Sequence, residues 1–145
     1  MRLLALDHGE KRIGLAFCDE LEIIASPFET WPNQGEATLV KLLALAKAEG
    51  VQGWVVGLPR HKDGAESATA PAAWAFGEAL AQRSQLPLAL VDEHLTSAEA
   101  ERLLAQRGVK PQDRKAKLDA AAAAVILQGF LEERRSRRIP VGSWT

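Results

Sequence analysis

The first 35 residues alternate between apolar runs and short polar turns, and this pattern predicts three consecutive β-strands. Residues 2–7 read as a buried strand and residues 12–18 as a second strand. Residues 22–31 read as a third extended segment. Gly14 lies in the middle of the second run, where a glycine marks a bulge or a close approach of backbone or ligand. The connections are short, so we expect an antiparallel meander.

After this point, helix-period segments alternate with short buried strands. The capping box Thr96-x-x-Glu99 marks the start of one helix, and Gly108 marks its end. Residues 109–117 are polar and basic, and we expect a mobile loop there. The expected helices are 36–49, about 66–84, 96 to about 107, and 116–134, and the expected strands are 52–58 and 87–92.

The element order β-β-β-α-β-α-β-α-α indicates an α/β protein with a mixed five-stranded sheet flanked by helices. Strands that alternate with helices should be parallel and central. This order is the plan of the RNase H-like fold and also of each half of the actin-like ATPases, and periodicity does not separate the two. We expect one domain over residues 1–138 and a C-terminal tail over 139–145.

Composition is that of a globular domain: the 145 residues are 47% apolar and 26% charged. No apolar run approaches the roughly 18–20 residues that cross a bilayer. The start of the chain lacks a signal-peptide pattern. Cys18 is the one cysteine, so neither an intramolecular disulfide nor a cysteine metal site is expected. We therefore expect a cytoplasmic protein that does not act at a membrane.

Charge is unevenly distributed although the net charge is only −1. The segment 102–138 holds ten Lys or Arg and four acids, a balance of +6, and the rest of the chain carries −7. This asymmetry is compatible with a basic face for a polyanion. It is equally compatible with solvated helix surfaces and a basic tail.

Acidic residues end two of the predicted strands and interrupt the apolar stripe of the last helix. Asp7 ends the first strand, and Asp92 and Glu93 end the last. Asp119 precedes Ala122, Ala123, Ile126 and Phe130 by 3, 4, 7 and 11 positions, so it shares the face that should pack on the sheet. An acid on a buried stripe is costly unless it is paired or binds a metal.

Carboxylates that converge at one end of a sheet repel one another unless a cation lies between them. Mg²⁺ and Mn²⁺ prefer carboxylate oxygens and keep waters for a substrate phosphate. Two such ions about 4 Å apart suit phosphodiester hydrolysis. Each acid also has an ordinary explanation: Asp7 as a turn cap, Asp92 or Glu93 as a loop entry, and Asp119 as an acid near a helix start.

The remaining reactive or aromatic side chains suggest little chemistry. His8, His61 and His94 lack ligand-like spacing, and we interpret them as surface or loop residues. We expect Cys18, Trp54 and Trp74 to lie in the core.

Four segments together resemble the YqgF/RuvX family, which is described as Holliday-junction-resolvase-like and as the pre-16S rRNA nuclease. They span nearly the whole chain in the family's order. The segments are LALDHGEKRIGLAFCD at 4–19, VVGLPRHKDG at 55–64, VDEHLTSAEAERLL at 91–104 and KLDAAAAAVILQGFL at 117–131.

The resemblance implies an RNase H-like fold and a nuclease site that binds Mg²⁺ or Mn²⁺. The metal-binding catalytic acids that it implies are Asp7, Glu93 and Asp119. Lys11, Arg12, Arg60 and Thr96 fall in matching motifs and are expected to contact substrate or support the site. The chain departs from the family at two positions: His94 stands where arginine is frequent, and His8 replaces a small or apolar residue, which would let it touch the metal's surroundings.

Our first hypothesis is therefore a metal-dependent endonuclease that acts on RNA, with maturation of the 16S rRNA 5′ end as its task. The second is a resolvase of four-way DNA junctions with the same chemistry, which should act as a homodimer. Two hypotheses from other classes are a small actin-like nucleotide-binding domain and a nucleic-acid-binding protein without catalysis.

Overall fold

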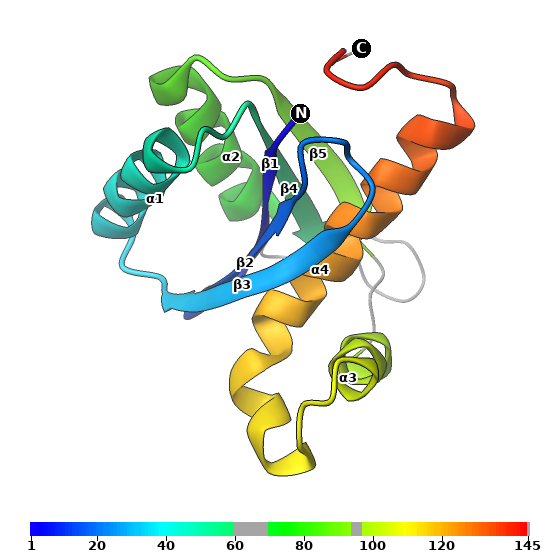
Figure 1. The fold of residues 1–145 in the computed structure, drawn as a ribbon. Coiled ribbons are helices and arrows are strands. Elements are labelled where there is room, and N and C mark those ends of the chain that lie inside the picture. The colour runs from blue at the N-terminus through cyan, green and yellow to red at the C-terminus, as the bar shows by residue number, and fades with distance from the viewer. Residues whose placement is uncertain (60–69, 94–96, 145) are drawn as a thin grey trace.

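The fold is a mixed five-stranded sheet in the order β3-β2-β1-β4-β5, which confirms the expected mixed sheet (Figure 1). The expectation that both late strands are central was wrong, because β1 is the central strand and β5 lies at the edge. The computed structural model describes residues 1–59, 70–93 and 97–144. β1, β2 and β3 are antiparallel neighbours, whereas β4 runs parallel to β1 and β5 runs parallel to β4. The strands are β1 Leu3–His8, β2 Arg12–Cys18, β3 Ala25–Pro32, β4 Gly53–Pro59 and β5 Leu88–Glu93; the helices are α1 Glu36–Ala48, α2 Ala70–Ser84, α3 Ser97–Gln106 and α4 Pro111–Ser136.

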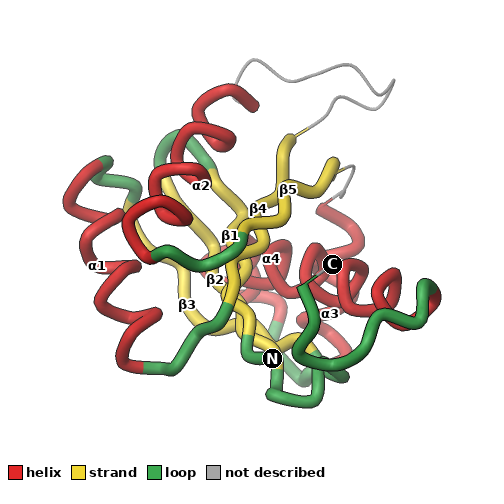
Figure 2. The backbone as a smooth tube through the Cα atoms, turned by 90° about the horizontal axis from the view of Figure 1, so that it is seen from above, coloured by secondary structure: helices red, strands yellow, loops and turns green. Residues whose placement is uncertain are grey.

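Helices cover both faces of the sheet, with α1 and α2 on one side and α4 on the other (Figure 2). Strand alternation divides the apolar side chains of β1 between the two layers. Leu4 and Leu6 belong to the core beneath α1 and α2, together with the fully buried Trp54. Leu3 and Ala5 belong to the core beneath α4. Asp7 continues the Leu3–Ala5 series, so it lies on the sheet face that α4 covers.

The close packing of α4 on β2 depends on small residues. Residues 120–124 of α4 are all alanine and all buried. Gly14 of β2 lies directly beneath this helix: a Cβ atom at Gly14 would stand 1.9 Å from the backbone oxygen of Asp119. Only glycine allows this approach, because any side chain would overlap the helix backbone. The glycine that the strand pattern singled out therefore marks a helix–sheet contact.

The segment 109–117 was wrongly expected to be a mobile loop, because α4 begins at Pro111. Proline is favoured in the first turn of a helix, where its missing N–H costs nothing. The Lys, Arg and Gln residues that follow it are good helix formers. Val109 and Leu118 pack against the buried residues between α3 and α4. The polar composition thus reflects one solvated side of an ordered helix.

Two of the three core assignments are confirmed. Trp54 is fully buried and Cys18 is 2% exposed, whereas Trp74 is 47% exposed and the expectation for it was wrong. The buried stripe of α2 consists of Ala70, Ala73, Gly77 and Leu80, and Trp74 lies beside it. None of the described helices is both long and apolar enough to cross a membrane.

Residues 139–144 fold back onto the body of the protein. The buried guanidinium of Arg134 donates to the carboxylate of Glu22 at 2.7 Å and to the backbone oxygen of Ser143 at 2.6 Å. The backbone N–H of Gly142 donates to the same Glu22 carboxylate. Trp144 stacks near Phe130, with ring centroids 6.1 Å apart. The end of α4, the β2–β3 turn and the C-terminal segment therefore form one packed unit.

Candidate active site

Asp7 lies near the end of β1 and has a glycine on each neighbouring strand. It pairs with Gly14 of β2 on one side and with Gly57 of β4 on the other. Neither neighbour carries a side chain, and on the β2 side the backbone of Asp119 takes the place of one above Gly14, beside the half-buried Asp7. The sequence pattern pointed to Gly14, but Gly57 drew no attention because only strand register shows that it lies opposite Asp7.

The first turns of α4 bring Asp119 beside Asp7 from a position 112 residues later in the chain. The backbone of Asp119 lies on Gly14, and Gly14 is the direct partner of Asp7. The side chain of Asp119 is 31% exposed, and its Oδ2 atom accepts a hydrogen bond of 2.9 Å from Nε of Arg12. Asp119 lies on the sheet-facing side of the helix, as expected, but at the edge of that side.

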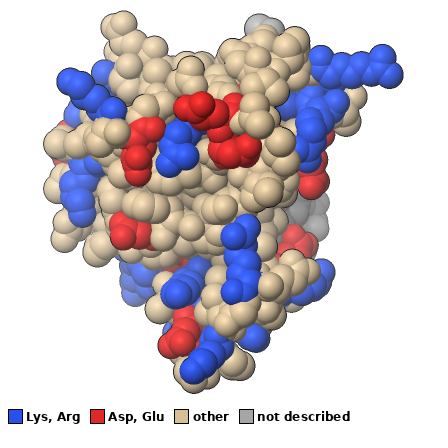
Figure 3. Space-filling view, viewed as in Figure 1, with Lys and Arg blue, Asp and Glu red and all other residues tan. Residues whose placement is uncertain are grey.

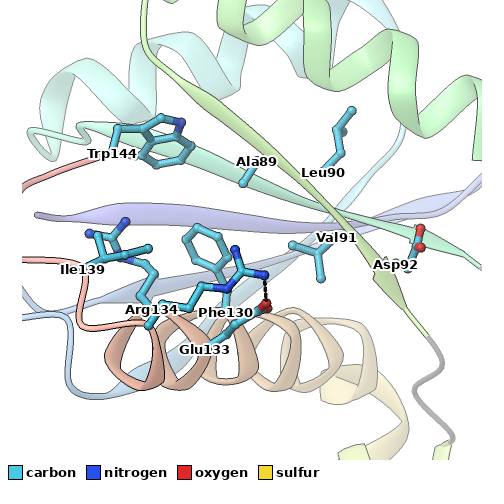
Figure 4. Close-up of a pocket in the computed structure, with 10 residues that line it drawn as sticks. Ala89, Leu90, Val91, Asp92, Phe130, Glu133, Arg134, Ile139 and Trp144 are labelled. Atoms are coloured by element: carbon cyan, nitrogen blue, oxygen red, sulfur yellow. Dashed lines mark ion pairs between the residues drawn. The ribbon is translucent and has the colours of Figure 1, made fainter.

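Glu93 is the last residue of β5 and pairs with Pro59 at the end of β4. Val91 pairs with Gly57, so Val91 lies in the same cross-strand row as Asp7. Figure 4 shows Val91 directed towards α4 and Leu90 on the opposite side of β5. By strand alternation the side chain of Asp92 lies on the face opposite Val91 and Asp7. Register thus argues against Asp92 as a partner of Asp7.

The distance between these strands bears on whether the three acids can meet. β5 lies two strand spacings from β1, about 10 Å across the sheet. Among the described side chains, no group of three or more His, Cys, Asp or Glu residues is arranged to hold a metal ion. The carboxylate of Glu93 is not among those side chains. The described pair is therefore Asp7 and Asp119, with the Glu93 backbone at the same end of the sheet.

Two of the four expected substrate-contacting residues, Lys11 and Arg12, lie where the β1–β2 turn leads into β2. Arg12 begins β2, is 64% exposed and pairs with Asp119. Lys11 is exposed, and its backbone oxygen accepts a hydrogen bond from the N–H of Asn33. Arg60 and Thr96 lie outside the described residues. The described cations thus border the acids on the β1–β2 side.

His8 was wrongly expected at the surface or beside the metal. Its side chain is 8% exposed and lies on the α1–α2 side of the sheet, opposite Asp7. The imidazole packs on Phe76 of α2, with ring centroids 4.8 Å apart. Burial lowers the pKa of His8 below 6.5, so the neutral ring is favoured. His61 and His94 lie outside the described residues.

Basic side chains gather over α3 and the first half of α4, in the lower part of Figure 3. The exposed members of this group are Arg102, Arg107, Lys110, Lys115 and Lys117. Lys115 precedes Asp119 by one helical turn, so the two residues share a side of α4. The uneven charge of the sequence therefore corresponds to a basic surface next to the acids.

Comparison with known proteins relates the whole chain to one family. A family profile described as RuvX, Holliday junction resolvase, matches residues 1–133. A protein of Symbiobacterium thermophilum, provisionally named a pre-16S rRNA nuclease, is 42% identical over 138 residues, which are 94% of this chain and 96% of the relative. A protein of Anaeromyxobacter sp. with the same provisional name is 42% identical over 94% of this chain and its own full length.

The fold also matches solved structures. RuvC of Thermus thermophilus in complex with a Holliday junction substrate superposes with a TM-score of 0.57 at 19% identity, over 94% of this chain and 96% of that one. A second Thermus thermophilus RuvC structure gives a TM-score of 0.53 at 14% identity. At these identities the likeness concerns the fold, and it confirms the RNase H-like architecture.

Proposed function

The chain belongs to the RuvX family, and on that premise we propose that it is a metal-dependent endonuclease that hydrolyses phosphodiester bonds. The catalytic carboxylates are those of Asp7, Glu93 and Asp119. The observation that carries this proposal is the contact of Asp119 with Gly14 directly beside Asp7. This contact brings Asp119 to the strand position beside Asp7, with the exposed Arg12 paired to the Asp119 carboxylate.

The residues of this site suit a hard divalent cation. Carboxylate oxygens are the ligands that Mg²⁺ and Mn²⁺ prefer, and the contact of α4 with Gly14 holds one carboxylate-bearing residue next to another. Bound at Asp7, Glu93 and Asp119, such an ion would offset the charge that develops on the phosphate and make a water more acidic. Lys11, Arg12, Arg60 and Thr96 hold the phosphodiester in place.

The substrate is a nucleic acid, and RNA is our first proposal. The basic surface of α3 and α4 borders Asp119 and would contact phosphates (Figure 3). The relatives with about 42% identity carry the provisional name of pre-16S rRNA nuclease. We therefore propose that the protein processes the 5′ end of pre-16S rRNA in the cytoplasm during ribosome biogenesis.

Resolution of four-way DNA junctions is the second candidate. The family description names a Holliday junction resolvase, and a similar fold occurs in RuvC with a Holliday junction substrate. A resolvase must cut two strands of one junction, so this function requires a dimer that presents two sites. The same three acids would cut either substrate, and only the surface that joins two copies of the chain into a dimer would be specific to the resolvase.

A cleavage assay on three substrates tests the proposal. Labelled single-stranded RNA, a pre-16S-like RNA and a four-way DNA junction are incubated with the protein in Mg²⁺ or Mn²⁺. We expect metal-dependent RNA cleavage that is abolished by Asp7→Asn and by Asp119→Asn. Asp113→Asn, at an exposed position in the first turn of the same helix, is the matched control and should cut normally.

The outcomes separate the hypotheses. Symmetrical cutting of the junction in preference to RNA would favour the resolvase. Cleavage by Asp7→Asn and Asp119→Asn at the parent rate would overturn the proposed site. No cleavage of any substrate, with tight binding of RNA, would favour a binding protein without catalysis.

A further inference from the structure

The turn between β1 and β2 carries the exposed Lys11 and leads into Arg12, whose guanidinium pairs with Asp119. Within the turn, the N–H of Gly9 donates to the backbone oxygen of Arg12 at 2.9 Å. A Cβ atom at Gly9 would stand 2.6 Å from that same oxygen, so the turn is tight. Exposed polar turns are mobile unless other segments hold their main chain. The place of both cations therefore depends on what holds this turn.

Asn33, directly after β3, bonds the main chain of this turn at two points. Pro32 ends β3 and pairs with Arg12, so the next residue along the chain lies beside the turn. The backbone N–H of Asn33 donates to the oxygen of Lys11 at 2.8 Å. Its side-chain Nδ2 donates to the oxygen of Gly9, also at 2.8 Å. The turn is thus tied to the end of β3 as well as closed on itself.

The orientation of the Asn33 amide follows from partners whose roles are certain. Its Oδ1 atom accepts a hydrogen bond of 3.0 Å from the N–H of Gly35, and a backbone N–H can only donate. Nδ2 therefore faces Gly9, whose backbone oxygen can only accept. The amide joins the β1–β2 turn on one side to the segment that opens α1 on the other.

The start of α1 gives Asn33 a base that does not involve the turn. Thr38 is 2% exposed. Its hydroxyl donates to the backbone oxygen of Pro32 and accepts from the N–H of Gln34, both at 2.9 Å. These two bonds hold the chain immediately before and after Asn33. A change in the Asn33 side chain can therefore release the turn without releasing the helix.

Asn33 also reaches the buried His8. Its Nδ2 atom lies 3.4 Å from Nε2 of His8, whose ring packs on Phe76 of α2. An amide nitrogen offers only hydrogen atoms, so Nε2 accepts and the proton of the neutral ring lies on Nδ1. The tautomer of His8 thus reports whether the Asn33 amide is in place.

We propose that Asn33 is a positioning residue of the nuclease site: it holds the β1–β2 turn so that Lys11 and Arg12 face the phosphodiester beside Asp119. The inference rests on the proposed nuclease function, because it takes the two cations as contacts of the substrate. Asn33 lies outside the four segments that resemble the family's motifs, so no motif points to it.

The test uses three variants of the full-length protein. Asn33→Asp keeps the acceptor for the N–H of Gly35 and replaces the donor to Gly9 by an oxygen atom. Gln34→Glu adds the same charge at the next, exposed position. Thr38→Val removes the two bonds of the hydroxyl and leaves the turn unchanged. Each is compared with the parent for RNA cleavage in Mg²⁺, for RNA binding in EDTA, and by NMR of isotope-labelled protein.

Asn33→Asp should lower kcat by about tenfold to a hundredfold, because a misplacement of about 1 Å in a catalytic site can cost about a hundredfold. RNA affinity should fall by less than about threefold beyond the effect of Gln34→Glu, because attraction between cations and phosphates does not need exact placement. Thr38→Val should lower the melting temperature and cut at the parental rate well below it.

The NMR spectra report on the turn itself. In Asn33→Asp the amide of Gly9 should exchange faster with solvent, because its turn is no longer held. The ring proton of His8 should move from Nδ1 to Nε2, because a carboxylate oxygen now accepts where an amide donated. Neither signal should change in Thr38→Val or in Gln34→Glu.

Cleavage by Asn33→Asp at the rate of Gln34→Glu would overturn the inference, and so would a ring proton on Nε2 of His8 in the parent. An equal loss of kcat in Thr38→Val would overturn it as well, because the loss would then follow stability. The two proposals fail separately. If the parent cuts nothing while the Gly9 and His8 signals respond as expected, the hold of Asn33 on the turn stands and the nuclease proposal falls. If the parent cuts RNA and Asn33→Asp matches its charge control, the nuclease proposal stands and this inference falls.

Discussion

Gly14→Ala is a one-carbon change that tests how the two acids are brought together. The added Cβ atom would lie 1.9 Å from the backbone oxygen of Asp119, 2.2 Å from its carbonyl carbon and 2.7 Å from the backbone nitrogen of Ala120. Ordinary contacts begin at about 3.4 Å, so the helix must move away from β2 by about 1.5 Å. Helix backbone cannot rotate aside as a flexible side chain does.

The expected cost follows from this overlap. Extra methyl groups in packed cores typically cost about 1–3 kcal/mol, and an obstacle made of backbone belongs at the upper end of that range. A loss of about 3 kcal/mol lowers the melting temperature of a chain of this size by about 6–12 °C. Because the same displacement carries Asp119 away from Asp7, we expect cleavage to fall further than stability does.

Thermal and urea unfolding of Gly14→Ala measure the first effect, and RNA cleavage well below its melting temperature measures the second. Gly129→Ala, in the same helix, is the control: its Cβ atom would meet nothing within 4 Å. It should stabilise the helix by about 0.5–1 kcal/mol and leave cleavage intact. Parent-like stability and cleavage in Gly14→Ala would refute the close approach of α4 to β2.

Two further predictions concern ion pairs. Burial alone would raise the pKa of Glu22, but hydrogen bonds from Arg134 and neighbouring groups hold this pKa below 4.5. The ion pair therefore stabilises the fold above about pH 4.5, and this contribution is lost as the pH falls through the lowered pKa. Glu22→Gln should therefore lower the free energy of unfolding by about 3 kcal/mol at pH 7 and by progressively less in acid, as measured by urea unfolding at several pH values. A decrease no larger than that of the exposed control Glu20→Gln would contradict the pairing. Arg12 pairs with the Asp119 carboxylate and so competes with a metal ion for it, besides its proposed contact with the phosphodiester. Arg12→Gln should therefore raise Mn²⁺ affinity by up to about five-fold in calorimetry and slow RNA cleavage, whereas weaker Mn²⁺ binding would contradict this competition.

Periodicity was sufficient to predict the strands and most of the helices, because β1 and β2 are short apolar runs buried on both faces and the helices bury one stripe. Asp119 is the clearest case at the site: its phase relative to Ala123 and Ile126 predicted a position towards the sheet, and its backbone lies on Gly14. The acid at the end of the first strand was equally visible, since a carboxylate after an apolar run stands out.

Features that depend on pairing between distant segments were not predictable. Gly57 gains its meaning only from register with Asp7, and register joins residues 50 positions apart. His8 adjoins Asp7 in sequence, yet strand alternation sends the two side chains to opposite faces, and the partner that buries His8 is Phe76 of α2. The start of α4 was missed because charged helix formers resemble a loop when the packing partner on α3 is unknown.

The most direct test of the central claim is an anomalous difference map from crystals grown with Mn²⁺. The account predicts a peak about 2.0–2.3 Å from carboxylate oxygens of Asp7 and Asp119, with Glu93 completing the set, and its loss in crystals of Asp119→Asn. Strong Mn²⁺ density elsewhere, for example at Asp92, with none between Asp7 and Asp119, would contradict the account.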